Sequence, residues 1–273
     1  MAGPAVVTQP ALAAAREWAA SAIQIADDIE AEGFEAAQKG AVFDMITPAD
    51  GQIERFLRDE AARRFPDHHF LGEEEGGAAL DDDAWTWVVD PIDGTLNYAT
   101  GLAGAASSIA LVHGGEPVIG AIGDFNTHRV YSAAAGSGHV VCQDGTAESL
   151  VVPAHTPVGM ARVFLEWGWE DLDAVMLGTL GMLAQTRQRV VRMVGGAAYA
   201  LLHVSLYGGA MLGIGLRLWD VAAGVVIARE AGLQVRLWQE GAAIHVVAGS
   251  ALDVRELAPI VERFGSSRLP AHV

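Results

Sequence analysis

The spacing of apolar and polar positions predicts helices first and strands afterwards in the first half of the chain. The pattern indicates one helix reaching about residue 33 and a second over 49–65, which Thr47 and Pro48 open as cap and first turn. The segment 85–89 reads as a continuous apolar run, typical of a strand that is covered on both faces. Further strands are expected at 107–112, 116–125 and 129–135.

In the second half, the pattern alternates between strand and helix periods. Strands are predicted at 161–167, 189–194, 233–238 and 243–249, and helices at 171–185, 197–208, 221–231 and 254–264. The stretch 193–216 lacks acidic and basic side chains, but its glycines and His203 favour a buried helix and strand over a membrane span. We therefore expect two α/β halves, residues 1–150 and 151–273, joined near 147–157 and sharing one catalytic cleft.

Composition and charge narrow the set of partners. A chain of 273 residues with 51% hydrophobic content can bury a large core. Its 34 acidic and 17 basic residues give a net charge of -17, which repels nucleic acid and anionic membranes, so neither is an expected partner. A phosphate ligand would need a local cation. The beginning of the chain has no basic signal region, which favours the cytoplasm.

The segment DPIDGT, which follows the apolar run, offers the strongest candidate chemistry. We expect the proline to end the strand, and the turn that follows can bring Asp90 and Asp93 toward one point. Paired carboxylates suit a hard cation such as Mg²⁺, while Gly94 and Thr95 at the start of a helix suit a phosphate. An ordinary β-turn followed by a helix explains the segment equally well. An aspartyl-phosphate of the haloacid-dehalogenase kind is excluded, because Pro91 stands where that nucleophile would be.

Three other acidic segments are ambiguous on their own. The glutamates 73–75 are more typical of a solvated surface, and FDMITPAD, with Asp44, Thr47 and Asp50, could be a simple helix start. Asp220, in LWDVAAG, would by default be the N-cap of the apolar helix after it.

Taken in order, these segments resemble one family. The series D-x-x-T-x-x-D, GEE, WxxDPIDGTxN and WD-x-A-A-G is similar to the inositol monophosphatase family of Mg²⁺-dependent, lithium-sensitive phosphatases, over nearly the whole chain. The resemblance implies an α/β (α+β) fold, a layered α-β-α-β-α sandwich like that of fructose-bisphosphatase and inositol monophosphatase, commonly found as a homodimer. It also implies a phosphoric monoester hydrolase that acts on a small phosphomonoester.

The resemblance further implies roles for individual residues. One Mg²⁺ would be held by Glu73, Asp90, the carbonyl of Ile92 and Thr95, and a second by Asp90, Asp93 and Asp220, with two or three ions per site. Asp50 and Thr95, with Glu73, would orient and deprotonate a metal-bound water, while the N–H groups of Gly94 and Thr95 hold the phosphate. Additional contacts to substrate or to ligands are expected from Lys39, Glu74, Arg192, Gly195 and Arg217.

The chain departs from the family pattern where the substrate would be chosen. Gly213 stands where inositol-hydrolysing members have an acidic residue, and Gly196 replaces a small hydroxyl residue. Inositol monophosphate or a related sugar or polyol phosphate is the first expected substrate. Histidinol phosphate, fructose bisphosphate and adenosine bisphosphate are alternatives, as is a non-enzymatic, transcription-associated role.

Overall fold

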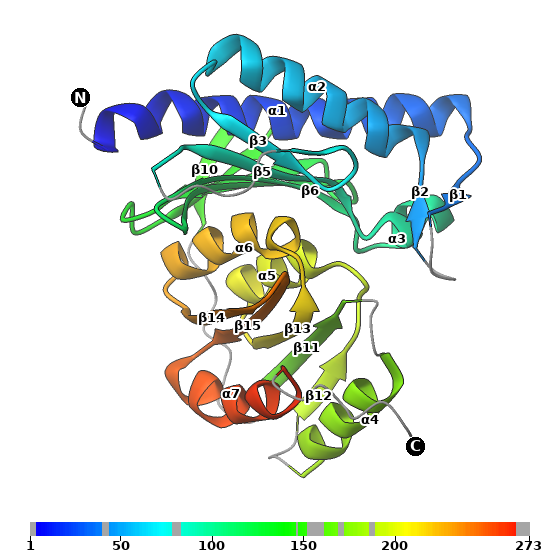
Figure 1. The fold of residues 1–273 in the computed structure, drawn as a ribbon, viewed down its shortest axis with the longest axis vertical. Coiled ribbons are helices and arrows are strands. Elements are labelled where there is room, and N and C mark those ends of the chain that lie inside the picture. Colours follow the sequence, from blue (N-terminus) through cyan, green and yellow to red (C-terminus); the bar gives the residue numbers. More distant parts are fainter. Residues whose placement is uncertain are drawn as a thin grey trace.

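The computed structural model describes residues 4–39, 44–77, 83–145, 147–151, 161–168, 172–185 and 189–265, arranged in five layers. Figure 1 shows helices α1 (Pro4–Glu32) and α2 (Pro48–Arg64) over a first sheet, and helices α5 (Ala197–Tyr207) and α6 (Leu218–Glu230) between that sheet and a second one. Helices α4 (Leu172–Leu183) and α7 (Ala251–Gly265) form the last layer. The predicted α-β-α-β-α sandwich is therefore confirmed.

The first sheet has eight strands in the order β10-β9-β8-β7-β6-β5-β3-β4. Its members are β3 (His69–Gly72), β4 (Gly76–Gly77), β5 (Thr86–Asp93), β6 (Ala106–His113), β7 (Glu116–Asp124), β8 (Arg129–Ala134), β9 (Val140–Asp144) and β10 (Ala147–Val151). All neighbours pair antiparallel except β3 and β5, which are parallel. A separate pair, β1 (Ala37–Gln38) and β2 (Met45–Ile46), and the short helix α3 (Thr95–Thr100) lie at one end.

The second sheet has five strands in the order β12-β11-β13-β15-β14. Its members are β11 (Ala161–Trp167), β12 (Arg189–Arg192), β13 (Ala210–Leu216), β14 (Gln234–Glu240) and β15 (Ala243–Gly249). Strand β11 runs parallel to both neighbours, while β13, β15 and β14 are antiparallel. The expected joint at 147–157 lies partly outside the described residues, and the division into 1–150 and 151–273 stays a prediction.

The expected long helices and strands are confirmed, but the proline in β5 does not end the strand. Pairing with β6 runs from Thr86 to Asp90 and resumes at Asp93, opposite Ala106. Two residues, Pro91 and Ile92, therefore oppose one on β6, which is the count of a β-bulge and a place where a strand tolerates proline. The bulge keeps Asp90 and Asp93 in the strand while breaking its ladder between them.

Alternation along β5 directs Asp90 toward the central helices. Trp87 and Val89 belong to the core beneath α1 and α2, and Trp18 meets Trp87 edge to face with ring centroids 4.7 Å apart. Val88 belongs to the core that includes residues of α5 and α6. Because successive side chains of a strand point to opposite faces, Asp90 shares the face of Val88. The charged end of β5 thus faces the middle layer.

Helix α6 begins earlier than its pattern indicated. It starts at Leu218, so Asp220 is the third helical residue and not the N-cap, which is Arg217. The Asp220 Oδ2 atom accepts the backbone N–H of Arg217 at 2.7 Å. The Ser108 hydroxyl, opposite Asp90 in β6, donates to the Trp219 carbonyl at 2.9 Å and so ties the start of α6 to the first sheet.

Several short strands were missed in the sequence. They are β1, β2, β3, β4, β9 and β10, of which β4 is only Gly76–Gly77. Such segments hold too few residues to display an alternation, so their pairing depends on neighbours that are distant in sequence. Within the described residues, no helix combines the length and the apolar character needed to cross a bilayer.

The approach of β7 to α6 yields a first test. A Cβ atom on Gly120 would overlap the carbonyl oxygen of Ala223, so Gly120→Ala must push α6 away from the first sheet. We expect this overpacking to lower the free energy of unfolding by about 1–3 kcal/mol, measured by urea denaturation.

The matched control is Gly181→Ala in α4, where a new Cβ would meet nothing within 4 Å. Removing glycine from a helix interior should instead stabilise the protein by about 0.5–1 kcal/mol. Equal effects of the two substitutions would contradict the packing argument.

Candidate active site

Asp90 is an almost completely buried carboxylate of the candidate site. Its exposed fraction is 2%, and its Oδ1 atom has no hydrogen-bond partner. Burial, followed by the charges of Glu73, Asp93 and Asp220, raises the pKa of Asp90 well above its ordinary value. These four acidic side chains come from β5, α6 and the turn after β3, so the fold brings three distant sequence motifs together.

Asp93 and Asp220 are both anchored by backbone N–H groups at helix starts. The Asp93 carboxylate accepts from Ala197 at 2.9 Å and from Tyr199 at 3.1 Å, which caps α5 across the boundary between the layers. Burial raises the pKa of Asp93 to about 8 and that of Asp220 well above its usual range, despite these donors. A nearby positive charge would therefore stabilise the ionised form of both carboxylates.

The candidate ligands are oxygen atoms, which a hard cation prefers, but they do not point toward a common centre. Among the described His, Cys, Asp and Glu side chains, no three are close enough to hold a metal ion as they are oriented. The carboxylates of Asp93 and Asp220 are turned to backbone N–H groups. The unpartnered oxygen of Asp90, with three further carboxylates around it, is what a divalent cation would satisfy.

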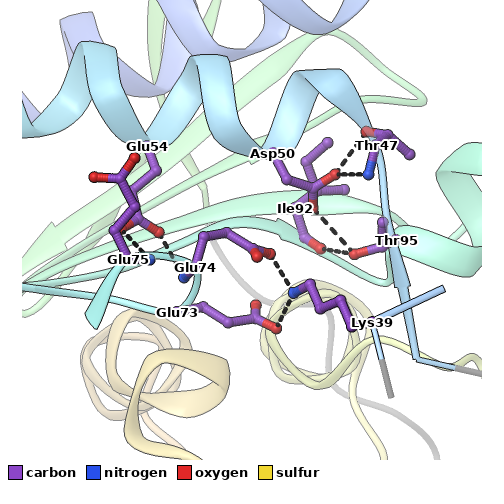
Figure 2. A network of polar contacts seen from close by, with 9 residues as sticks. All are labelled: Lys39, Thr47, Asp50, Glu54, Glu73, Glu74, Glu75, Ile92 and Thr95. Atoms are coloured by element: carbon purple, nitrogen blue, oxygen red, sulfur yellow. Dashed lines mark hydrogen bonds and ion pairs between the residues drawn. The ribbon is translucent and has the colours of Figure 1, made fainter. Parts of the chain in front are cut away.

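Thr95 and Asp50 form a hydrogen-bonded pair beside the bulge (Figure 2). The Thr95 hydroxyl lies 2.9 Å from the Ile92 carbonyl and 3.2 Å from Asp50 Oδ1. The other oxygen of Asp50 accepts from the N–H and hydroxyl of Thr47 at 2.7 and 2.6 Å, which fixes the carboxylate at the start of α2. Burial raises the pKa of Asp50 to about 6.

Lys39 lies against the acidic turn, as Figure 2 shows. Its ammonium is 3.2 Å from Glu73 and also contacts Glu74. Although burial works against its charge, these two glutamates raise the pKa of Lys39 above its ordinary value, so the group is a fixed cation. Burial raises the pKa of Glu74 to about 7. The only lysine of the chain is thus part of the site and not an isolated surface residue.

Glu54 holds the acidic turn in place and was missed in the sequence. Its side chain, fully buried in α2, accepts the backbone N–H of Glu74 at 2.8 Å and that of Glu75 at 3.0 Å. Arg58 compensates its charge at 2.8 Å. The available signal was a glutamate on the buried face of an amphipathic helix, which requires a partner. The turn at 73–75, which the composition favoured as a solvated surface, is instead anchored to the first layer.

Two glycines allow the backbone to approach closely around Asp93. Gly94 has φ +82°, and a Cβ atom there would lie 2.5 Å from the Gly104 carbonyl. A Cβ atom on Gly196 would lie 2.6 Å from the same carbonyl and 2.9 Å from Asp93 Oδ2. The hydroxyl residue that the family pattern has at position 196 would therefore not fit here without movement.

The other residues expected to contact the substrate lie at the end of β12 and before the starts of α5 and α6. Arg192 is exposed and donates to the neighbouring carbonyl of Val191, while Gly195 lies in the turn before α5. Arg217 reaches the acidic group through its backbone N–H. Gly213 is buried in β13, and a Cβ atom there would lie 2.5 Å from Leu216 and 2.6 Å from Val246. Apolar side chains thus occupy the space that an acidic residue would need.

The fold and the acidic groups gathered around Asp90 are those of a layered phosphatase, and the comparisons agree. A model of the inositol monophosphatase family matches residues 8–265. The chain belongs to this family. The family match also confirms the expected class of enzyme, a phosphoric monoester hydrolase.

Individual relatives support the assignment. Inositol-1-monophosphatase SuhB of Mycobacterium tuberculosis is 36% identical over 206 residues, covering 72% of this chain and 70% of that protein. Inositol monophosphatase 2 of Homo sapiens is 31% identical over 226 residues, covering 80% and 77%. The solved structure of Mycobacterium tuberculosis SuhB superposes with a TM-score of 0.75 at 32% identity, covering 93% of this chain and 96% of that one. Dimerisation and a cytoplasmic location stay predictions.

The role of Glu54 can be tested by stability. In Glu54→Gln the amide can accept only one of the two turn N–H groups and faces the other with its own NH₂, while Arg58 loses the nearer of its two carboxylate partners and keeps Glu75. We expect a loss of about 2 kcal/mol in the free energy of unfolding, measured in urea. Glu35→Gln, at an exposed position, should change it by less than about 0.5 kcal/mol. Equal free energies of unfolding for the two variants would contradict the anchoring role of Glu54.

Proposed function

We propose that the protein is a Mg²⁺-dependent phosphatase that hydrolyses a small phosphomonoester with water and without a covalent phosphoenzyme. The observation that carries the proposal is the buried, unpartnered Oδ1 of Asp90 among Glu73, Asp93 and Asp220. An uncompensated group of buried carboxylates is unfavourable on its own, and a divalent cation would relieve it.

The ligand roles follow the resemblance, and the burial of these carboxylates around Asp90 supports them. Asp90 would serve both metal positions, Glu73 with the Ile92 carbonyl and Thr95 would complete one, and Asp93 and Asp220 the other. Their oxygen-only chemistry suits Mg²⁺, which keeps several waters and binds substrate phosphate. When bound, the metal would acidify a water and neutralise the phosphate charge. Two or three ions per site are the family expectation.

Asp50 and Thr95 supply the proton acceptor. The Thr95 hydroxyl, 3.2 Å from Asp50, can accept a hydrogen bond from the attacking water while it donates to the carboxylate. Because burial raises the pKa of Asp50 to about 6, its ionised form can take up a proton near neutral pH. Thr47 holds the other oxygen, so proton transfer occurs at Oδ1.

The phosphate would lie against the backbone of Gly94 and Thr95. The glycine at φ +82° allows close approach of an anion to the backbone there. Helix α3 has only six residues, so backbone N–H groups and metal charge carry the interaction more than a helix dipole. Lys39, fixed by Glu73 and Glu74, adds a positive charge at the edge of the site in a chain of net charge -17.

Inositol monophosphate is the first candidate substrate because the relatives named above act on it. The apolar surroundings of Gly213 offer no carboxylate to bind its hydroxyl groups, however. A site without a buried polar partner cannot reject an analogue for lacking a hydroxyl. We therefore propose a broad range of small sugar and polyol phosphates, with inositol phosphate among them.

The proposed metal ligands are tested by Asp93→Asn. With Mg²⁺ present, release of phosphate from inositol 1-phosphate should fall by about 100-fold or more, because the amide cannot supply the charge of the second metal position. Asp59→Asn, at an exposed position of α2, should retain wild-type activity. Chelation should abolish wild-type turnover, and added Mg²⁺ should restore it.

A wild-type protein that hydrolyses none of a panel of phosphomonoesters, including histidinol phosphate and the two bisphosphates, would refute the enzymatic proposal. That outcome would favour the non-enzymatic alternative.

The consequence of Gly213 is tested by selectivity. The values of kcat/KM for inositol 1-phosphate and for glycerol 2-phosphate should agree within about tenfold, since no group at position 213 is left unpaired by the smaller substrate. Initial rates of phosphate release at several concentrations give both constants. A preference for inositol 1-phosphate of about 1,000-fold or more would show that another residue reads its hydroxyls.

A further inference from the structure

A second buried glutamate anchors the turn on the opposite side of the site. Glu166 lies at the end of β11, with an exposed fraction of 5%. Its Oε1 atom accepts the backbone N–H of Val194 at 2.9 Å, and its Oε2 atom accepts that of Gly195 at 3.1 Å. This is the arrangement by which Glu54 holds Glu74 and Glu75.

The anchored turn forms the wall behind Gly94. The Asn97 side chain donates to the Val194 carbonyl at 2.6 Å and to the Gly104 carbonyl at 3.1 Å. A Cβ atom on Gly94 would lie 3.2 Å from the Gly195 carbonyl. The turn at 194–195 is therefore fixed from one side by Glu166 and from the other by Asn97. Asn97 also links the turn to the start of α3, because its backbone N–H donates to the Gly94 carbonyl at 2.9 Å.

The charge of Glu166 has no cationic partner in the described part of the chain, since no ion pair to it is found there. Burial raises its pKa to about 7 in spite of the two N–H donors. A buried carboxylate held only by neutral donors stabilises a fold less than an apolar side chain of similar volume would. A stabilising role alone does not account for its presence in the otherwise apolar strand VFLEW.

We propose that Glu166 is a positioning residue that fixes the 194–195 turn and, through it, the Gly94–Thr95 backbone that receives the phosphate group. This inference rests on the proposed phosphatase function. Glu166 touches neither the phosphate nor the Asp50–Thr95 pair, so its effect falls on phosphate binding and not on proton transfer. The hydrogen bonds that cap Asp93 do not involve the 194–195 turn, because Ala197 and Tyr199 belong to α5, which is held by its own buried face.

The test compares Glu166→Gln with Glu240→Gln, an exposed position at the end of β14. Glutamine keeps the volume but can accept only one of the two N–H groups. In the presence of Mg²⁺, the Kd for inorganic phosphate, measured by calorimetry, should rise about five- to tenfold in Glu166→Gln, and KM should rise by the same factor. The value of kcat should change by less than about twofold, and Glu240→Gln should match the wild type in all three.

The outcomes separate this inference from the proposed function. A wild type that binds phosphate and turns over esters, with a Glu166→Gln variant of equal Kd and KM and only a lower Tm, overturns the positioning role alone. A fall in kcat at constant KM also overturns it. A wild type that neither binds phosphate nor hydrolyses any ester overturns both the proposed function and the role of Glu166. If the wild type binds phosphate but hydrolyses no ester, the Kd values from calorimetry still decide the role of Glu166.

If Glu166→Gln does not fold, Asn97→Ala loosens the same turn from the other side. It should give the same rise in phosphate Kd and KM with little change in kcat. An unchanged Kd in a folded Asn97→Ala variant would overturn the proposal, because Asn97 carries the second anchor of the turn.

Discussion

Burial of mutually repelling carboxylates between two sheets is the constraint on which the rest of the site depends. Asp90, Asp93 and Asp220 meet where the end of β5 faces the start of α6, and desolvation is the largest cause of the raised pKa of each. A fold cannot keep such charges inside without donors or cations close by. The polar contacts described around the site reduce the energetic cost of burying these carboxylates.

Backbone N–H groups donate most of the hydrogen bonds that these buried carboxylates accept. Asp93 and Asp220 each accept N–H groups at the start of a helix, while Glu54 and Glu166 each span two consecutive N–H groups of a turn. Asp93 and Asp220 keep lone pairs that a cation could use. Glu54 and Glu166 instead fix the two turns beside the site. Helix α2 and strand β11 thus contribute matching anchors, one for the acidic turn and one for the turn behind the proposed phosphate-binding backbone.

The periodicity of the sequence predicted the long elements well, because they display a helical or strand period over many residues, whereas the order of the layers was predicted from the resemblance to the family. The sequence misplaced Pro91, since a proline inside a strand is tolerated at a bulge, and a bulge is defined by the partner strand. It also missed Glu54 and Glu166, whose partners are backbone N–H groups 20 and 28 residues away. Such partners have no side-chain signature, so only a charged residue on a buried face could have indicated them.

In the proposed function, catalysis and substrate choice are separable, because the residues assigned to them lie in different layers. The proposed proton acceptor Asp50 lies in α2 and Asp90 in the first sheet, whereas Gly213 lies in β13 of the second sheet, opposite Glu166 in β11. At position 213 the glycine leaves no space for a side chain, because Leu216 and Val246 pack against it. At position 166 the chain has kept a buried charge, whose oxygens are already occupied by the 194–195 turn. Since neither position offers a free acceptor, the proposed phosphatase would have to discriminate among leaving groups through the shape of the site and the exposed turn itself. The carboxylates around Asp90, as proposed metal ligands, would act on the phosphate whatever group it is attached to.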